Sequence, residues 1–428
     1  MKSTEGRTLY RRALGILSGL ALSCAQTVNA VGDDAHVDAG RDLGRFEDAT
    51  VEDAHADASP PRDVTAQCDT AECGQRAINL HVGAYLAQAR LADGRTVGWG
   101  WNNAGQLGQG DFHLGPRPVA IPPESRLFLG HSIDCRIDPD HSLWCWGLDI
   151  AEVLGTRQRA VDRGPTTARL IMTGVVDVAV GDGILCAVRE DLHVDCIGTS
   201  DNFSIGSEGN PGIYRIPMRV NGVAGVTRMS QSTSPDGTFC AFSARETYCW
   251  GRAHLGLFGD GVRYGTPPRL LPSWAGATRI DVDNIACSLD AMGLVGCAGS
   301  GIDRFTGAIL GFTARSAQVR TIMQGLPPMT DFAVGGYTLC GVDYEGAVWC
   351  TGNNQAGQVG VEMSETWLPP RRVSLVGVAE QVGCGMVSCC ARLRSGQVWC
   401  WGENPYGQLG RPRAELAYSF VPVRVTWE

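Results

Sequence analysis

Residues 400–410 read CWGENPYGQLG, and versions of this stretch recur along the chain. The nearest copies are GWGWNNAGQLGQG at residues 98–110 and CTGNNQAGQVGV at residues 350–361. In each copy a Trp-Gly pair, or a pair in its place, is followed by a Gly-rich turn. Segments with this much Gly do not continue a helix, so the pattern predicts short strands joined by tight turns.

The copies recur about every 50 residues. Each contains an apolar segment ending in Gly, such as residues 178–181, then a hairpin, the Trp-Gly pair and a Pro-flanked segment such as residues 116–119. Several short strands in a unit of this length are typical of a propeller blade. The predicted fold class is therefore all-β, a seven-bladed β-propeller over residues 77–428 with a disordered N-terminal tether. The position before the shared Gly is occupied in turn by Trp99, Trp146, Ile197, Trp250, Ala298, Thr351 and Trp401.

The repeat resembles that of the regulator of chromosome condensation family, through the core at Cys400 to Gly410 and looser forms elsewhere. The resemblance covers roughly residues 77–428 and implies seven blades of four antiparallel strands around an axis. Kelch repeats, with a similar period but a different Gly-Gly and aromatic arrangement, are the alternative.

The C-terminal segment VPVRVTW, residues 421–427, matches the Pro-flanked strand that follows each earlier Trp-Gly pair. The first repeat begins without such a strand before Ile78. We therefore expect residues 421–427 to complete the first blade, which would remove two exposed sheet edges.

Cysteines recur in pairs ten residues apart, once nine apart, and each pair ends just before the Trp-Gly position. Residues at this spacing face each other across a short hairpin, within the range that a disulfide spans. Blade one has Gln88 and Gly98 in these places. The alternative is that buried cysteines act as small apolar residues, and zinc is disfavoured because the spacings are not CxxC. The predicted disulfides are Cys135–Cys145, Cys186–Cys196, Cys240–Cys249, Cys287–Cys297, Cys340–Cys350, Cys390–Cys400 and two local pairs, Cys68–Cys73 and Cys384–Cys389.

Residues 1–24 are predicted to be an export signal, with Arg11 and Arg12 before an apolar stretch that is too short to span a bilayer. Leu20 to Cys24 resembles a bacterial lipobox, which implies lipidation of Cys24. It departs from that pattern at Ala21 and Leu22. The alternative is ordinary cleavage after Ala30.

Residues 31–75 hold 12 acidic residues against three arginines and few apolar side chains. Such a composition predicts disorder, here as an acidic tether between a membrane anchor and the propeller. The alternative is an exported tail with no tethering role. With the leader, the tether and the cysteine pairs, the sequence predicts an exported protein, either an outer-membrane or cell-surface lipoprotein or a secreted one.

The repeat region is close to neutral, because the tether carries most of the formal net charge of −9. This excludes the basic footprint of a nucleic-acid-binding protein. Lys2 is the only lysine, which excludes lysine-based catalysis in the propeller. No HExxH, GxSxG or P-loop motif is present. His131, His141, Asp134 and Asp138 surround one hairpin, where ordinary hairpin polarity explains them. We therefore predict no enzyme, no metal site and no cofactor.

Most tryptophans belong to the repeat and are predicted to pack inside the blades. Trp101, Trp274 and Trp367 fall outside its pattern and are candidates for exposed anchors that contact a partner.

The sequence predicts a protein-binding propeller whose partner is unknown. The resemblance implies partners such as guanine-nucleotide switch proteins, chromatin or β-lactamases, but the contact residues of those relatives cannot be matched here. A carbohydrate-binding or carbohydrate-cleaving propeller is the alternative, and it would need exposed aromatics on one rim and, for cleavage, paired carboxylates. A third possibility is a structural surface protein without a specific ligand.

Overall fold

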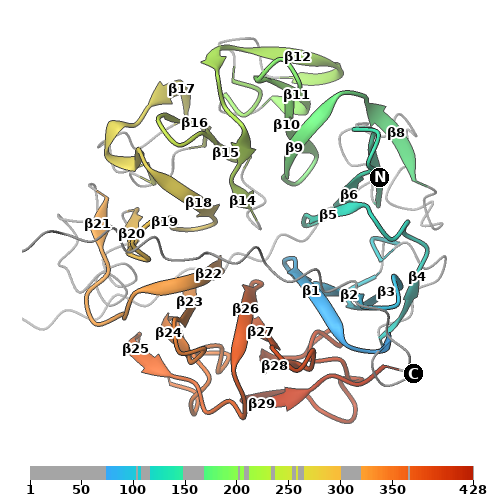
Figure 1. Cartoon of the computed structure of the whole chain (residues 1–428), viewed down its shortest axis with the longest axis vertical. Coiled ribbons are helices and arrows are strands. Elements are labelled where there is room, and N and C mark those ends of the chain that lie inside the picture. The colour runs from blue at the N-terminus through green and yellow to red at the C-terminus, as the bar shows by residue number, and fades with distance from the viewer. Residues whose placement is uncertain are drawn as a thin grey trace, which may run out of the picture. The chain divides into compact units, whose positions relative to one another are not determined.

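Seven sheets surround a common axis in the computed structural model (Figure 1). Six sheets have four strands and one has five. The predicted all-β, seven-bladed propeller is therefore confirmed. The predictions for the leader, most of the tether, Cys24 and Cys68–Cys73 lie outside the described residues. The structure describes residues 74–102, 105–107, 116–147, 168–200, 203–206, 212–232, 237–252, 257–258, 265–299, 320–364 and 367–427.

Apart from the five-stranded sheet, each blade runs outward from the axis in the order of the sequence, and its first strand lies innermost (Figure 1). Blades one to three contain β1 (Ala77–Val82), β2 (Leu86–Leu91), β3 (Thr96–Gly100), β4 (Arg117–Val119), β5 (Arg126–Leu129), β6 (Ile133–Ile137), β7 (Leu143–Gly147), β8 (Arg169–Met172), β9 (Val175–Val180), β10 (Ile184–Arg189), β11 (His193–Ser200) and β12 (Gly212–Ala224).

Blade four contains β13 (Arg228–Met229), β15 (Thr238–Phe242), β16 (Thr247–Gly251) and β17 (Thr266–Leu270). The short strand β14 (Gln231–Ser232) pairs in parallel with the first strand of blade five, so it forms the fifth strand there. Blades five to seven contain η2 (Pro272–Trp274), β18 (Ala277–Val282), β19 (Ala286–Asp290), β20 (Val295–Ala298), β21 (Thr321–Ile322), β22 (Met329–Gly335), β23 (Thr338–Asp343), β24 (Val348–Gly352), β25 (Leu368–Arg372), β26 (Ala379–Cys384), β27 (Ser388–Leu393), β28 (Val398–Glu403) and β29 (Tyr418–Arg424).

The hairpin between the second and third strands of a blade sets the cysteine pairs opposite each other. Cys186 pairs with Cys196 in the strand register, and their Cα atoms are 4.1 Å apart. Seven of the eight predicted pairs have their sulfur atoms at bonding distance, and all fourteen of these cysteines are buried. In blade one, Gln88 faces Gly98 at the same register position.

The four repeated tryptophans are buried, and each joins its own blade to the one before it. The Trp401 indole N–H donates to the carbonyl of Gln358, in the Gly-rich turn of blade six, at 2.9 Å. Trp250 donates in the same way to Ser204 of blade three at 3.1 Å. The shared turn therefore presents a carbonyl to its neighbour, which explains why tryptophan recurs at this position.

The prediction that residues 421–427 complete the first blade is wrong. β29 pairs antiparallel with β28 of blade seven, and blade one has its own outer strand, β4. The Pro-flanked strand is the outer strand of the blade whose Trp-Gly pair it follows. The first repeat already contains all four of its strands, so no strand is left for the C-terminus to replace.

Blades one and seven are joined by single hydrogen bonds and ring stacking instead. The Ala77 N–H donates to the Gly396 carbonyl at 2.9 Å. Trp427 follows β29, donates its indole N–H to the carbonyl of Gln75 at 3.1 Å, and stacks on Trp99 with ring centroids 6.3 Å apart. In the described part of the chain, no helix is both long and apolar enough to cross a membrane.

Candidate binding face and axial channel

Four rings from three blades gather at one end of the propeller. Tyr85 lies between β1 and β2, Trp101 follows β3, His131 lies between β5 and β6, and Tyr406 follows β28. Since neighbouring strands in a blade are antiparallel, these four loops emerge at the same end of the blades. We call Tyr85, Trp101, His131 and Tyr406 the aromatic cluster.

Tyr85 is at the centre of the aromatic cluster. Its ring centroid is 5.4 Å from that of Tyr406, 5.9 Å from that of His131 and 6.1 Å from that of Trp101, all in edge-on orientations. Trp101 also lies 5.6 Å from His131 and 5.9 Å from Tyr406. Edge-to-face contacts in this range are stabilising, so the rings hold one another in place. Tyr406 is exposed and the other three are half-buried, which leaves a pre-formed aromatic surface open to solvent.

The surroundings of the aromatic cluster are acidic. Burial raises the pKa of the Tyr85 hydroxyl, and Tyr406, Asp283 and Glu403 raise it further. The Nδ1 atom of His131 is 3.9 Å from a carboxylate oxygen of Asp182. Negative potential at this end of the propeller favours ligands that present a positive or hydrogen-bond-donating group.

Ser132, His131 and Asp182 resemble a nucleophilic triad in composition but not in geometry. The Ser132 hydroxyl donates to the Asp182 carboxylate at 2.5 Å, and His131 Nδ1 is 3.2 Å from the hydroxyl oxygen. In a triad the carboxylate orients the histidine, and the histidine takes the serine proton. Here the Ser132 hydroxyl directs its proton to the Asp182 carboxylate and not to His131, so the arrangement positions the His131 ring within the aromatic cluster.

The three tryptophans predicted as exposed anchors have three different surroundings. Trp101 belongs to the aromatic cluster. Trp367 is half-buried, and its ring lies edge-on to Tyr337 at 5.5 Å. The prediction for Trp274 is wrong, because its side chain is only 1% exposed. No motif in the sequence points to Tyr85 or Tyr406. Their place in turns beside a repeat was a weak signal, since only closure of the ring brings them together.

Trp274 is buried because blade five lacks the repeated tryptophan. Ala298 occupies that position, in the same apolar cluster as Trp274. The Trp274 indole N–H donates to the carbonyl of Phe258, in the turn of blade four, at 3.0 Å. A residue from outside the repeat pattern thus supplies the bond to the preceding blade that Ala298 cannot make.

The axis is open as a channel of about 660 Å³ lined by all seven blades. On its innermost strand each blade has one polar residue at an equivalent position around the channel. This residue lies opposite the one that comes two places after the cysteine position on the second strand. Blade one has Gln88 in that cysteine position. We call this set the axial ring. It consists of Asn79, Arg126, Asp177, Arg228, Arg279, Asp331 and Gln381.

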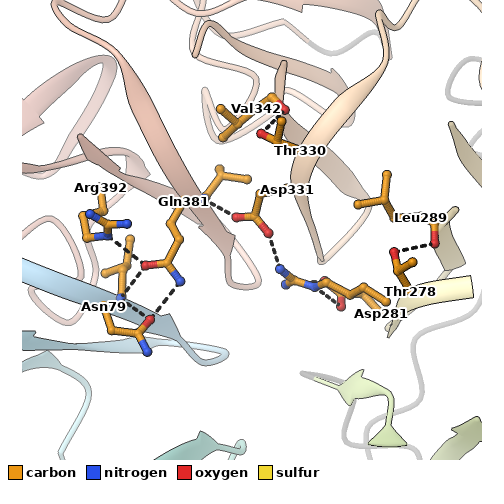
Figure 2. A network of polar contacts seen from close by, with 12 residues as sticks. Asn79, Thr278, Asp281, Leu289, Thr330, Asp331, Val342, Gln381 and Arg392 are labelled. Carbon is orange, nitrogen blue, oxygen red and sulfur yellow. Dashed lines mark hydrogen bonds and ion pairs between the residues drawn. The ribbon is translucent and has the colours of Figure 1, made fainter. Parts of the chain in front are cut away.

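Carboxylate and amide oxygens of the axial ring accept hydrogen bonds from the next blade. Asp331 Oδ2 accepts the Val382 backbone N–H at 2.8 Å, and Asp177 does the same toward blade four. Gln381 Oε1 accepts the Leu80 N–H at 3.0 Å, which joins blade seven to blade one (Figure 2). Buried N–H groups need such partners, so the ring links blades where no sheet continues between them.

Arginines of the axial ring make the complementary contact. Arg126 donates to the carbonyl of Val176 at 2.7 Å, and Arg228 donates to that of Thr278 at 3.1 Å. In both cases the carbonyl belongs to the residue just before the ring residue of the next blade. Side chains of either sign therefore fulfil the same structural role.

Arg279 is compensated by two carboxylates. It contacts Asp281 of its own strand at 2.9 Å and Asp331 of the next blade at 2.5 Å (Figure 2). Burial lowers the pKa of Arg279, but Asp281 and Asp331 outweigh burial, and the net shift is upward. Burial raises the pKa of Asp281, and the charge of Arg279 offsets this only in part.

One group of potential metal ligands occurs among the described residues, formed by Cys340, Cys384 and Cys389. Each of these sulfurs already belongs to a disulfide. Disulfide sulfurs are not thiolate ligands, so the group offers no metal site in this state.

Comparison with known proteins places repeats of one family in the last two blades. Models of the "Regulator of chromosome condensation (RCC1) repeat" match residues 329–358, 380–408 and 395–428. Among curated proteins, the mouse and human E3 ubiquitin-protein ligases HERC2 are each 27% identical over 223 residues. That match takes in 50% of this chain and 4% of the relatives, so the chain spans only a small part of their length.

Solved structures give the same architecture. Prp20p from Saccharomyces cerevisiae has a TM-score of 0.64 at 16% identity, over 83% of this chain and 89% of that one. Yeast RCC1 (Prp20) bound to Kap60 has a TM-score of 0.65 at 16% identity, over 83% and 86% of the two chains. At this level of identity the likeness shows the fold alone.

Proposed function

We propose that this chain is an exported propeller that binds a protein partner through the aromatic cluster. The observation that carries the proposal is the cluster itself, in which rings from three blades are held together and left partly exposed. Rigid aromatic side chains with a polar tip are enriched among the residues that dominate binding energy at protein interfaces. The nearby carboxylates favour a partner segment that is basic or rich in donors.

The fold supports this proposal. Propellers of the RCC1 type are a protein-binding fold: yeast RCC1 has been seen bound to Kap60, and Prp20p has been described with its binding properties to Gsp1p and histones. We do not assign those partners to this chain. We also propose that it is not an enzyme, since Ser132 and His131 are arranged for structure rather than for proton transfer.

Seven buried disulfides support export, because such bonds persist in oxidising compartments. Together with the predicted leader, they favour an outer-membrane or cell-surface lipoprotein anchored at Cys24, or a secreted protein cleaved after Ala30.

A photo-crosslinker placed in the aromatic cluster tests the binding face. The sequence has a single lysine, Lys2, so amine-reactive reagents would not label the propeller. We would replace Tyr406 with p-benzoylphenylalanine and, as the matched control, replace Tyr344, which is 67% exposed in a hairpin at the opposite end of the blades. Illumination on intact producing cells should give a discrete protein adduct from position 406 and none from position 344.

Once the partner is identified, Trp101→Ala should weaken its affinity about tenfold or more, and Tyr344→Ala should leave it unchanged. Equal adducts from both positions, or full affinity in Trp101→Ala, would refute the assignment of this face. The carbohydrate alternative predicts instead that a glycan array is positive and that Trp101→Ala abolishes the signal.

A further inference from the structure

A second cavity, of about 350 Å³, lies between blades one and two beside the axial channel. It shares Asn79, His81 and Arg126 with the channel wall. The connection from β4 to β5 also contributes to its lining, so it opens toward the end of the propeller opposite the aromatic cluster. We call it the side cavity.

The lining of the side cavity is cationic. Arg90, Arg126 and His81 all line it, with Asn79 and Ser125 as neutral polar neighbours. Among the described residues that line it, there is no aspartate or glutamate. This sets it apart from the axial channel, whose wall contains two aspartates as well as three arginines.

Arg90 is a buried cation without a counter-ion. Arg90 is only 6% exposed. Its guanidinium donates hydrogen bonds to the carbonyls of Gly94, Pro122 and Ser125 at 3.0–3.1 Å. Within the described ranges, no carboxylate pairs with it. Burial lowers the pKa of Arg90. Burying an unpaired charge is costly, in contrast to Arg279, which has two carboxylates.

The interface between blades one and two differs from the others because of Asn79. Asn79 contacts the preceding blade and not the next one: its Oδ1 accepts a hydrogen bond from Gln381 Nε2 of blade seven at 2.8 Å (Figure 2). Arg90 makes the contact to blade two in place of Asn79, by donating to the carbonyl of Ser125, the residue just before Arg126. Arg126 makes the equivalent contact to blade three, at the carbonyl of Val176. The replacement brings a full positive charge where most other blades have an ion pair or an amide.

The pKa of the neighbouring His81 side chain is affected by these arginines. Its pKa is lowered to about 4 by burial and by the charges of Arg90, Arg279 and Arg126. Arg126 is paired with the Asp177 carboxylate of blade three at 2.6 Å, and Arg279 has its own two carboxylates, so Arg90 is the uncompensated positive charge beside the side cavity.

From the arrangement of these groups we infer that the side cavity binds a small oxyanion, held by Arg90 and Arg126 with Asn79 and His81 as further hydrogen-bonding groups. Two guanidinium groups match the planar geometry of phosphate, sulfate and carboxylate oxygens. The volume admits an inorganic oxyanion or a small organic molecule that carries such groups. The inference is independent of the protein-binding face, which lies at the other end of the blades.

Titration calorimetry of the oxidised full-length protein tests this site, using phosphate, sulfate and citrate against chloride at matched ionic strength. We expect saturable binding of at least one oxyanion and none of chloride. Phosphate or sulfate binding would point to a phosphoryl or sulfo group, and binding of citrate alone would point to an organic polyacid.

Arg126→Gln is the test variant: the Arg126 side chain is 59% exposed, but it also pairs with Asp177 at 2.6 Å, so unfolding of the variant is measured beside its oxyanion binding. Arg228→Gln is the matched control, since Arg228 has the same position in blade four but lies outside the side cavity. We expect Arg126→Gln to weaken oxyanion binding at least tenfold and Arg228→Gln less than twofold. The inference fails if no oxyanion binds, or if both variants weaken binding equally.

Discussion

At the scale of single residues, Asp134 departs most clearly from the repeat. It lies opposite Trp146 in the hairpin register, where blades three and six have Leu185 and Leu339. Its Oδ1 accepts the Gly130 N–H at 3.1 Å, and its Oδ2 is buried with no partner. Burial raises the pKa of Asp134 well above its ordinary value, and the bond from Gly130 offsets this only in part.

This burial predicts how stability depends on pH. A carboxyl with a higher pKa in the folded than in the unfolded protein binds its proton more tightly when folded. Stability is therefore fully present below the unfolded pKa of about 4 and falls as the pH rises through the folded pKa. Asp134→Asn keeps an acceptor for Gly130 and removes the charge. We expect it to be about 1–3 kcal/mol more stable than the wild type at pH 7.5, with the difference shrinking toward pH 4.

Guanidinium unfolding at several pH values under non-reducing conditions measures this difference. Glu345→Gln, at an exposed position in the β23–β24 turn, is the control and should show no comparable pH-dependent gain. A stability advantage of Asp134→Asn that is the same at every pH would contradict the explanation.

At the scale of the elements, the hairpin of blade one is the one that lacks a cysteine pair. Gln88 takes that place, fully buried, and neither side-chain amide atom has a hydrogen-bond partner. Its Cγ lies 3.4 Å from the position that a Cβ on Gly98 would occupy. The methylene groups of Gln88 therefore fill the space that a disulfide fills in the other blades, but the Gln88 amide is buried without a hydrogen-bond partner.

A double substitution, Gln88→Cys with Gly98→Cys, should restore the missing disulfide. The two residues are directly opposed, as the paired cysteines are, and a loop of this length stabilises by about 2–3 kcal/mol in the chain-entropy model. Leu107 and Val119 must shift slightly, because a Cβ at residue 98 would lie 3.1 Å from each. Unfolding of the oxidised protein and a count of its free thiols measure the effect. Each single variant serves as a control, and a double variant that oxidises without any gain in stability would rule the explanation out.

The elements also show why the sequence predicted some features and missed others. Hairpins, the blade count and the cysteine partners within the blades follow from local spacing and from the repeat period, and these predictions agree with the structure. Trp274 and residues 421–427 were misassigned, because their surroundings depend on which blade a segment joins. The aromatic cluster could not be seen in advance, since Tyr85 and Tyr406 meet only when the first and last blades become neighbours.

At the scale of the whole molecule, the disulfides and the predicted leader both favour export to an oxidising compartment. If the chain is a lipoprotein, labelled palmitate should be incorporated into the wild type and lost in Cys24→Ala. The oxidised protein should show almost no free thiol after denaturation, since the other cysteines are paired and Cys24 is either lipidated or removed with the leader. Absence of label in the wild type would leave the secreted form, and abundant free thiols in the native protein would contradict export itself.

The ring closes through a few hydrogen bonds and the Trp99–Trp427 stack rather than through a strand shared by two blades. Apart from the two residues of β14, each sheet is therefore encoded by one uninterrupted stretch of the gene. Duplicating or deleting one repeat would leave the hydrogen bonding within the remaining sheets intact and would require new backbone and side-chain contacts between blades. The same property makes the loops between blades suitable points for opening the chain in a circular permutant, in which a linker would join Gln75 and Trp427, whose indole already contacts the Gln75 carbonyl.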